Sequence, residues 1–190
     1  MSEPDAAMAR AFRLEQFEDY LTFERGLSAR TVSAYRRDLA RFMAFASDAG
    51  GRAPADVDTA MLRAWVFELR DAGLAASSIR RARSALRTYF GFLLAEGALE
   101  IDPTDRLEAP QAPRALPDFL SRDEVDRLLD APDPGHPLYW RDRAVLEFLY
   151  ASGVRVSELV ELPISSLDLE EGFALVFGKG AKERLVPVGA

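Results

Sequence analysis

The sequence contains no cysteine and a single histidine, His136, which removes several kinds of site from consideration. Without cysteine the chain has no disulfide, no thiolate nucleophile and no zinc–thiolate centre, and one histidine cannot make a multi-histidine metal site. We therefore expect no metal. His136 stands in a proline-rich stretch far from any serine or acidic motif, so we interpret it as a surface residue.

Long hydrophobic runs are also missing. No apolar stretch approaches the roughly 20 residues that a membrane-spanning helix needs, and the first residues lack the basic and then apolar pattern of a signal peptide. We therefore expect a cytoplasmic protein with no membrane partner.

Lysine is scarce and acidic residues are in excess. Lys179 and Lys182 are the only lysines, 22 of the 24 basic residues are arginine, and the net charge is -7. Although this total argues against a nucleic-acid partner, the positive charge is segmental. Residues 72–95 hold four arginines and no acid, whereas residues 96–135 hold eleven acids against four arginines.

The first hundred residues predict four helices with short connections, a compact helical bundle. We expect helix one over residues 9–24, stopped by Gly26, and helix two after an N-cap at Ser28. Asp58 caps a third helix that ends near Gly73. The fourth is expected to be capped by Ser77 or Ser78. Each helix carries a stripe of apolar side chains that we expect to face the core. These are Phe12, Phe17, Tyr20, Leu21 and Phe23 on helix one; Val32, Tyr35, Leu39, Phe42 and Ala46 on helix two; Leu62, Trp65, Val66 and Leu69 on helix three; and Ile79, Ala82, Leu86, Phe90 and Leu93 on helix four.

The sequence divides into a helical domain at 1–100, an interdomain linker at 101–117 and a second domain at 118–190. Four prolines between residues 100 and 117 predict an extended connection.

In the second domain, Ser121 with Glu124 forms a capping box for a helix through residue 129, and another helix runs from about 138 to 152. Strands at 173–177 and 184–188 flank a Gly-Lys-Gly turn. This domain looks incomplete, because a single hairpin is marginal in water. The fold class is therefore mainly α, with a four-helix bundle followed by the start of an α+β domain.

Arg155 and Lys179 are the two candidates for phosphate chemistry. Arg155 opens a short helix after Gly153, and a guanidinium can neutralise a phosphoryl charge with two parallel hydrogen bonds. The alternative is that Arg155 pairs with Glu158, three residues on. Lys179 lies in the glycine-flanked turn and could donate a proton to a leaving oxygen, with Lys182 as the weaker candidate. The alternative is a solvated hairpin turn without a chemical role.

Hydroxyl and arginine side chains on helices two and four could contact nucleic-acid phosphates. The alternative is that these arginines only keep a helical bundle in solution. For helix four, which lacks acids, nucleic-acid binding is the favoured interpretation. The candidate residues are Ser28, Arg30, Thr31, Tyr35, Arg37 and Arg41 on helix two, and Ser77, Ser78, Arg80, Arg83 and Arg87 on helix four.

Over nearly its whole length the sequence resembles the tyrosine recombinases, the integrase family, of the XerC/XerD type. The residues that carry the resemblance are GLSARTVSAYRRDLARF at 26–42, SSIRRARSALRTYFGFLLAEG at 77–97, DPTDRLEAPQAPRALPDFLSRDEVDRLL at 102–129, RDRAVLEFLYASGVRVSELVEL at 141–162 and GKGAKERLVPVG at 178–189. Two distant catalytic segments occur in the family's order and at its spacing.

The resemblance implies a core-binding domain and a catalytic domain that clamp duplex DNA. It also implies a reaction that cleaves and rejoins DNA through a 3′-phosphotyrosyl link, carried out by four protomers without a cofactor. Arg155 matches the first catalytic arginine, Glu158 supports it, and Lys179 matches the hairpin lysine that protonates the leaving 5′ oxygen. We also count Lys182 among the candidate DNA-binding residues. Chromosome dimer resolution or integration, with an activating partner protein, is the implied setting.

The sequence departs from the family at one place. The family's His-x-x-Arg segment and its nucleophilic tyrosine match no residue here, and His136 does not fit that pattern, so we expect this chain by itself to bind DNA without cleaving it. Two other functions stay open. One is a naturally short DNA-binding protein that occupies recombination sites. The other is a helical protein-interaction module.

Overall fold

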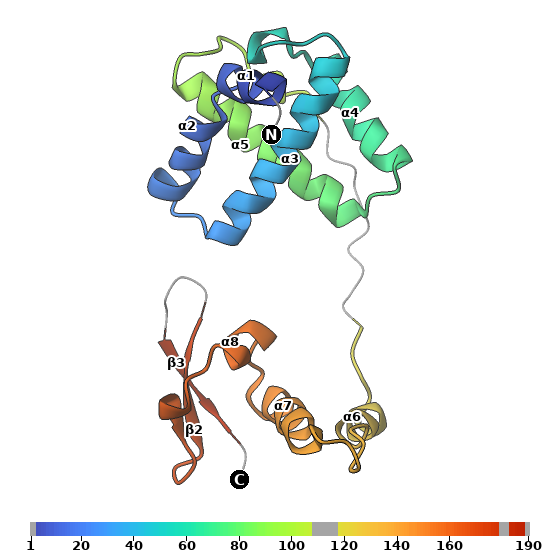
Figure 1. The fold of residues 1–190 in the computed structure, drawn as a ribbon, viewed down its shortest axis with the longest axis vertical. Helices are drawn as coiled ribbons and strands as arrows, with labels where there is room; N and C mark the ends of the chain where they lie inside the picture. The colour runs from blue at the N-terminus through green and yellow to red at the C-terminus, as the bar shows by residue number, and fades with distance from the viewer. Residues whose placement is uncertain (1–2, 108–117, 179–182, 189–190) are drawn as a thin grey trace. The chain divides into compact units, whose positions relative to one another are not determined.

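The chain folds as two compact units, Met1–Arg114 and Ala115–Ala190. The computed structural model describes residues 3–107, 118–178 and 183–188. The first unit is built from helices, and the second combines helices with a small antiparallel sheet (Figure 1). The predicted mainly α fold, a helical bundle followed by a unit with a β-hairpin, is confirmed. None of the helices in the described residues is long and apolar enough to span a membrane.

The first unit packs its helices around one aromatic core. Along the chain these are α1 (Glu3–Ala11), α2 (Leu14–Asp19), a π-helical turn (Tyr20–Glu24), α3 (Ala29–Asp48), a 3-10 turn (Pro54–Asp56), α4 (Thr59–Asp71) and α5 (Ala76–Ala95). Trp65 and Phe42 lie edge to face with ring centroids 5.2 Å apart, and both are fully buried. The stripes predicted for the third and fourth helices are buried as expected.

The predicted single helix over 9–24 is wrong. Arg13 adopts a left-handed conformation with φ 49° and separates α1 from α2, and a π-helical turn follows. Two residues five positions apart lie roughly 140° apart around a regular helix, so one straight helix would not bury both Phe12 and Phe17. The break at Arg13 lets both enter the core, at 1% and 0% exposure. Phe23, predicted to point inward, is 80% exposed.

Two of the three helix caps predicted for the first unit are confirmed. The Oγ of Ser28 accepts a hydrogen bond from the Thr31 amide, and Oδ1 of Asp58 accepts one from the Met61 amide at 2.7 Å. The predicted cap of the fourth helix by Ser77 or Ser78 is wrong. Ala75 occupies the N-cap position of α5, and the Ser78 amide already bonds to the Ala75 carbonyl at 2.9 Å, so the helix begins before either serine.

The first residues of the predicted linker belong to the first unit. Leu107 is 3% exposed and packs in the aromatic core. Thr59 on α4 donates to the Pro103 carbonyl at 2.9 Å, and Arg63 on the same helix donates to the Arg106 carbonyl at 3.2 Å. Residues 101–107 are therefore anchored rather than free, because α4 and the core hold them. Residues 108–117 of the predicted linker lie outside the described residues.

In the second unit, helices lead into a sheet of strand order β1-β2-β3. The elements are α6 (Arg122–Leu129), α7 (Tyr139–Ser152), α8 (Val156–Val160), a 3-10 turn (Ile164–Ser166), β1 (Leu167–Asp168), β2 (Phe173–Phe177) and β3 (Glu183–Pro187). The predicted box at the start of α6 is confirmed, since Glu124 accepts from both the amide and the hydroxyl of Ser121. β1 was not predicted, because two residues carry no periodicity, and β3 begins one residue earlier than expected.

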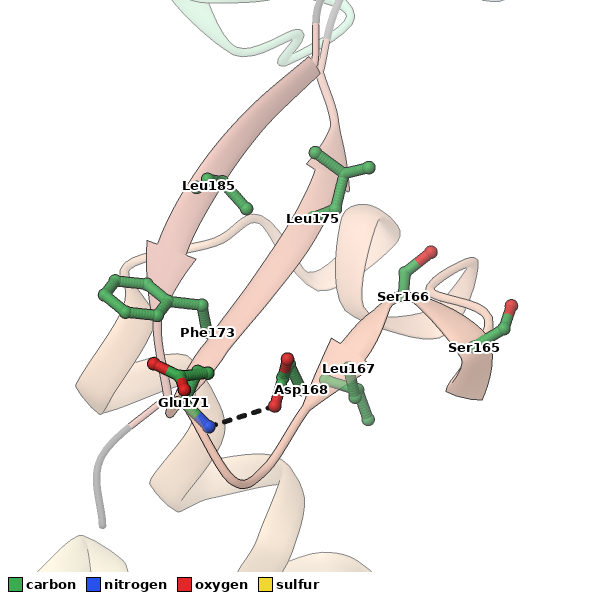
Figure 2. Close-up of a pocket in the computed structure, with 8 residues that line it drawn as sticks. All are labelled: Ser165, Ser166, Leu167, Asp168, Glu171, Phe173, Leu175 and Leu185. Atoms are coloured by element: carbon green, nitrogen blue, oxygen red, sulfur yellow. Dashed lines mark hydrogen bonds between the residues drawn. The ribbon is translucent and has the colours of Figure 1, made fainter.

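The two faces of the sheet differ in their surroundings. Ala174, Val176 and Val186 are buried against the α7–α8 junction, where they pack with Val154. The opposite face carries the cross-strand pair of Leu175 and Leu185, which lines an open groove of about 520 Å³ (Figure 2). Among the described residues, the sheet thus packs on the helices through the face that carries Ala174, Val176 and Val186.

Candidate active site and nucleic-acid surface

The junction between α7 and α8 sets the position of Arg155. Gly153 ends α7 with φ 62°, a left-handed conformation that favours glycine, and its amide bonds to the Leu149 carbonyl at 3.0 Å. Ser152 braces the turn, since its hydroxyl donates to the Phe148 carbonyl at 2.6 Å and accepts from the Val154 amide at 3.4 Å. Arg155 follows in extended conformation at the N-cap of α8.

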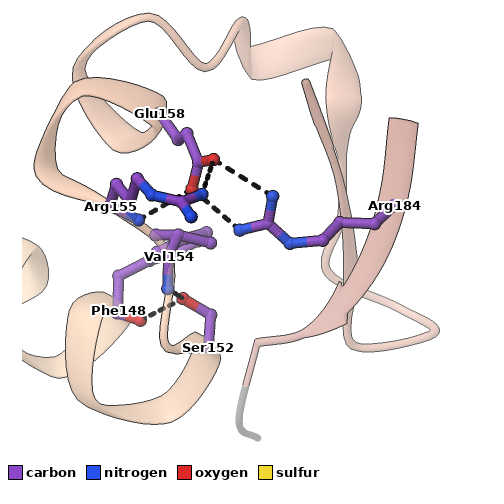
Figure 3. Close-up of polar contacts among 6 residues, drawn as sticks. All are labelled: Phe148, Ser152, Val154, Arg155, Glu158 and Arg184. Carbon is purple, nitrogen blue, oxygen red and sulfur yellow. Dashed lines mark hydrogen bonds and ion pairs between the residues drawn. The ribbon is translucent and has the colours of Figure 1, made fainter. Parts of the chain in front are cut away.

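Glu158 binds two arginines at once (Figure 3). The Arg155 amide donates to Oε2 at 2.8 Å, and the Arg155 Nη1 donates to Oε1 at 2.8 Å. From β3, Arg184 donates to the same two oxygens, Nη1 to Oε1 at 3.1 Å and Nη2 to Oε2 at 2.8 Å. The Glu158 side chain is 6% exposed, whereas that of Arg155 is 68% exposed. A buried carboxylate therefore holds an exposed cation.

The charge state of Glu158 follows from these contacts. The hydrogen bonds from the Arg184 guanidinium, and then the one from the Arg155 amide, lower the pKa of Glu158 to about 2. Burial acts in the opposite direction but is outweighed. The same carboxylate raises the pKa of Arg184 above its ordinary value. Glu158 is therefore ionised at neutral pH, and the formal charges of Arg155, Glu158 and Arg184 sum to +1.

Arg155 keeps the capacity to bind an anion. A guanidinium offers five N–H donors in a planar fork, and Glu158 takes only the Nη1 donor of Arg155. The sequence left open whether Arg155 serves a phosphate or pairs with Glu158. The pairing is present, but it leaves more than half of the side chain accessible. Lys179 and Lys182, the other candidates for phosphate chemistry, lie outside the described residues.

Arg184 is a site residue that sequence reasoning missed. A signal was present in the strand pattern, because position 184 has the same parity as Val186, whose side chain is buried. An arginine at an inward-facing position of a strand needs an acidic partner. The pattern identified the strand, but the partner lies 26 residues earlier in the sequence and is brought near only by the fold.

On the first unit, α3 presents exposed candidates for nucleic-acid binding. Arg30, Arg37 and Arg41 are exposed, and none forms an ion pair with another described residue. The hydroxyls of Ser28 and Thr31 lie 3.0 Å apart at the start of the helix. The sixth candidate on α3, Tyr35, is half-buried at the edge of the core. These arginines are therefore accessible to a phosphate, while Tyr35 also has a packing role.

The candidates on α5 divide into exposed and occupied residues. Ser77 and Arg80 are exposed, and Ser78 is half-buried. Arg87 is exposed but donates to the Leu107 carbonyl at 3.0 Å. Arg83 is only 4% exposed and donates to the same carbonyl at 2.6 Å, so its guanidinium is turned to the start of the linker rather than to solvent. Burial, and then the neighbouring charge of Arg87, lower the pKa of Arg83.

The described side chains were compared with the arrangement that a metal site needs. Within residues 7–107, 118–178 and 183–188, no group of three or more histidine, cysteine, aspartate or glutamate side chains is arranged to hold an ion. His136 is exposed, and its Nδ1 accepts a hydrogen bond from the Leu138 amide at 3.2 Å.

Two family descriptions match the chain, one for each unit. The N-terminal SAM-like domain of phage integrase matches residues 14–97, and the phage integrase family matches residues 118–190. Tyrosine recombinase XerD of Chlorobaculum tepidum is 45% identical over 179 residues, which is 93% of this chain and 59% of the relative. Tyrosine recombinase XerC of Xanthomonas campestris pv. campestris is 46% identical over 177 residues, 93% of this chain and 55% of the relative.

Solved structures share the fold. A lambda integrase dimer bound to a COC′ core site superposes with a TM-score of 0.72 at 23% identity, covering 92% of this chain and 47% of that one. XerH site-specific recombinase bound to palindromic difH substrate gives a TM-score of 0.64 at 22% identity, covering 91% and 52%. The chain thus spans less than two thirds of the length of these relatives and structures.

Proposed function

The chain belongs to the phage integrase family of tyrosine recombinases, and from this premise we propose that it binds duplex DNA and holds a scissile phosphate in site-specific recombination. The observation that carries the proposal is sequence identity of 45–46% to XerD and XerC over 93% of the chain, which includes both units. The reaction to which these residues would contribute is cleavage and rejoining of duplex DNA through a 3′-phosphotyrosyl intermediate, and its nucleophilic tyrosine matches no residue of this sequence. In this reaction Arg155 neutralises the phosphate, Glu158 fixes Arg155, and Lys179 protonates the leaving 5′ oxygen.

The accessible charge of Arg155 supports this role. A phosphodiester develops additional negative charge as a nucleophile adds to it, and a preorganised guanidinium stabilises that charge without moving. Arg155 is held by its backbone amide and by Nη1, which leaves its other donors for an oxygen of the phosphate. Glu158 stays ionised at neutral pH, because its pKa is about 2.

The DNA contacts proposed for the first unit come from its exposed arginines. Arg30, Arg37, Arg41 and Arg80 carry charge that no ion pair within the described residues neutralises. Arg83 is left out, because it is buried and bonds to Leu107. We propose recombination between two duplexes by four protomers, in line with a lambda integrase tetramer bound to a Holliday junction, a structure of TM-score 0.74 and 23% identity.

Binding to duplex DNA at several salt concentrations tests the proposal. Fluorescence anisotropy should give an affinity for labelled duplex whose logarithm falls linearly with log salt, with a slope of about 0.9 for each phosphate contacted. The variant Arg30→Gln/Arg37→Gln/Arg41→Gln should lower this slope by about two to three. Arg36→Gln is the matched control, since Arg36 lies on the same helix but pairs with Glu18 at 3.1 Å. Absence of salt-dependent binding even at low salt would instead favour a protein-interaction module.

A further inference from the structure

Arg184 and Arg155 share one carboxylate. Each oxygen of Glu158 accepts one hydrogen bond from Arg155 and one from Arg184, at distances between 2.8 and 3.1 Å. Arg184 donates hydrogen bonds to the Glu158 carboxylate from both terminal nitrogens, whereas the Arg155 side chain donates from Nη1 alone. The Glu158 side chain is only 6% exposed, so solvent screens its charge weakly.

The net charge of Arg155, Glu158 and Arg184 together determines whether they attract an anion. Arg155 and Glu158 alone form a neutral pair, and a neutral pair has little attraction for a phosphodiester of charge -1. Arg184 changes the total to +1, because a second cation faces the same carboxylate. Each arginine forms an ion pair with Glu158 at 2.8 Å, and the Glu158 side chain is only 6% exposed. Ion pairs are stronger where water is excluded than in bulk solvent. The charge of Arg155 is therefore not cancelled by its own partner.

The sheet fixes Arg184 in this position. Arg184 is the cross-strand partner of Val176, which is 1% exposed and packs beneath the α7–α8 junction. Figure 3 shows the Arg184 side chain reaching from β3 toward the start of α8, with Glu158 between the two arginines. The hairpin is thus joined to α8 by a charged contact in addition to its apolar face.

We propose that Arg184 is a positioning residue, which neutralises Glu158 so that the charge and the free donors of Arg155 remain available to a phosphodiester. The inference rests on the proposed function, in that it takes Arg155 as the phosphate ligand. Without Arg184, both oxygens of Glu158 would be open to the Arg155 guanidinium, which would turn onto the carboxylate and away from the phosphate.

The test uses the 190-residue chain and dimethyl phosphate as a probe of charge -1. The Nε–H resonance of Arg155, identified by its loss in Arg155→Lys, is followed by NMR while the probe is added. Arg184→Met should weaken the response about tenfold. It should also raise the pKa of Glu158 from about 2 toward its ordinary value, which a carboxyl-carbon NMR titration would measure. Arg184→Lys should retain most of the affinity, because it keeps the charge. Arg141→Met is the matched control, since Arg141 pairs with its neighbour Asp142 in the same unit.

The decisive variant is Arg184→Met/Glu158→Gln. It restores the net charge of +1 and keeps an oxygen for the Arg155 amide, so it should recover the affinity that Arg184→Met loses. A residue that only stabilised the fold would not be rescued by removal of a second contact. Equal affinities in the wild type, Arg184→Met and the double variant would overturn the inference and leave DNA binding by the first unit unaffected. A wild type whose Arg155 does not respond to the probe also overturns it, and duplex binding, measured separately, then decides the proposed function.

Discussion

Arg81 on α5 holds the carboxylate of Asp38 on α3 with two hydrogen bonds, Nε to Oδ2 at 2.8 Å and Nη2 to Oδ1 at 3.0 Å. Asp38 is buried at 6% exposure, and Arg81 reaches it from a partly exposed position. The contact joins the two 20-residue helices of the first unit at a point where an unpaired carboxylate would be costly.

Removal of Arg81 should destabilise the first unit. Arg81→Met leaves the buried Asp38 oxygens without donors, and we expect the free energy of unfolding to fall by about 2 kcal/mol. Urea denaturation followed by far-UV circular dichroism measures the change. Arg80→Met is the control, because Arg80 is exposed and forms no ion pair with a described residue, and it should stay within about 0.5 kcal/mol of the wild type. Equal effects of the two changes would contradict a stabilising role for the pair.

The anchoring of residues 101–107 can be tested at Leu107. Leu107→Ala removes a side chain that is 3% exposed in the core and should lower the free energy of unfolding by about 2–4 kcal/mol. Ile101→Ala provides the comparison, since Ile101 is 78% exposed and its truncation should cost less than about 0.5 kcal/mol. If the first unit unfolded identically in both variants, the segment would be a free linker, as the sequence alone suggested.

Glu158 should make the second unit sensitive to acid. Its pKa is about 2 in the folded protein and near 4.5 in an unstructured chain, so the folded state favours the ionised form. The stabilisation is complete above about pH 4.5 and is lost as the pH falls toward 2. Glu158→Gln should flatten this dependence, as measured by amide exchange at Val176 and Val186 between pH 2 and pH 6. Glu161→Gln, at an exposed position nearby, should keep the wild-type profile.

Tyr89 should behave as a structural tyrosine. It is 1% exposed, and its hydroxyl donates to the Phe12 carbonyl at 2.8 Å. Burial raises the pKa of Tyr89 above its ordinary value. Tyr89→Phe leaves that carbonyl without its donor and should cost about 1 kcal/mol in urea denaturation, whereas Tyr150→Phe, at 63% exposure, should cost almost nothing. No loss in Tyr89→Phe would mean that another donor replaces the hydroxyl.

Sequence reasoning succeeded where the signal is local. The caps Ser28 and Asp58 lie three residues before the amides that they bind, so both could be identified from spacing. It failed at Arg13, because no neighbouring residue requires a left-handed conformation there. That conformation is fixed by the burial of Phe12 and Phe17, which depends on helices far along the chain.

The candidate site shows the same limit. Arg155 and Glu158 were identified together, since they are three residues apart, whereas Arg184 acts across 26 residues and was read only as part of a strand. The burial of Arg83 was also missed. Its helical position shares a face with Arg80 and Arg87, but Leu107 covers that part of the face. Helical periodicity carries no information about a segment that packs over the helix from elsewhere in the chain.

The buried arginine at position 83 also offers a route to a more heat-resistant protein. Its Nε has no hydrogen-bond partner among the described residues, and besides burial the charges of Arg87 and Arg70 lower its pKa. A methionine there would keep much of the volume and remove a desolvated cation, while Arg87 would still hold the Leu107 carbonyl. Engineering for crystallisation or for work at elevated temperature can therefore begin at this position and leave the exposed arginines of α3 untouched.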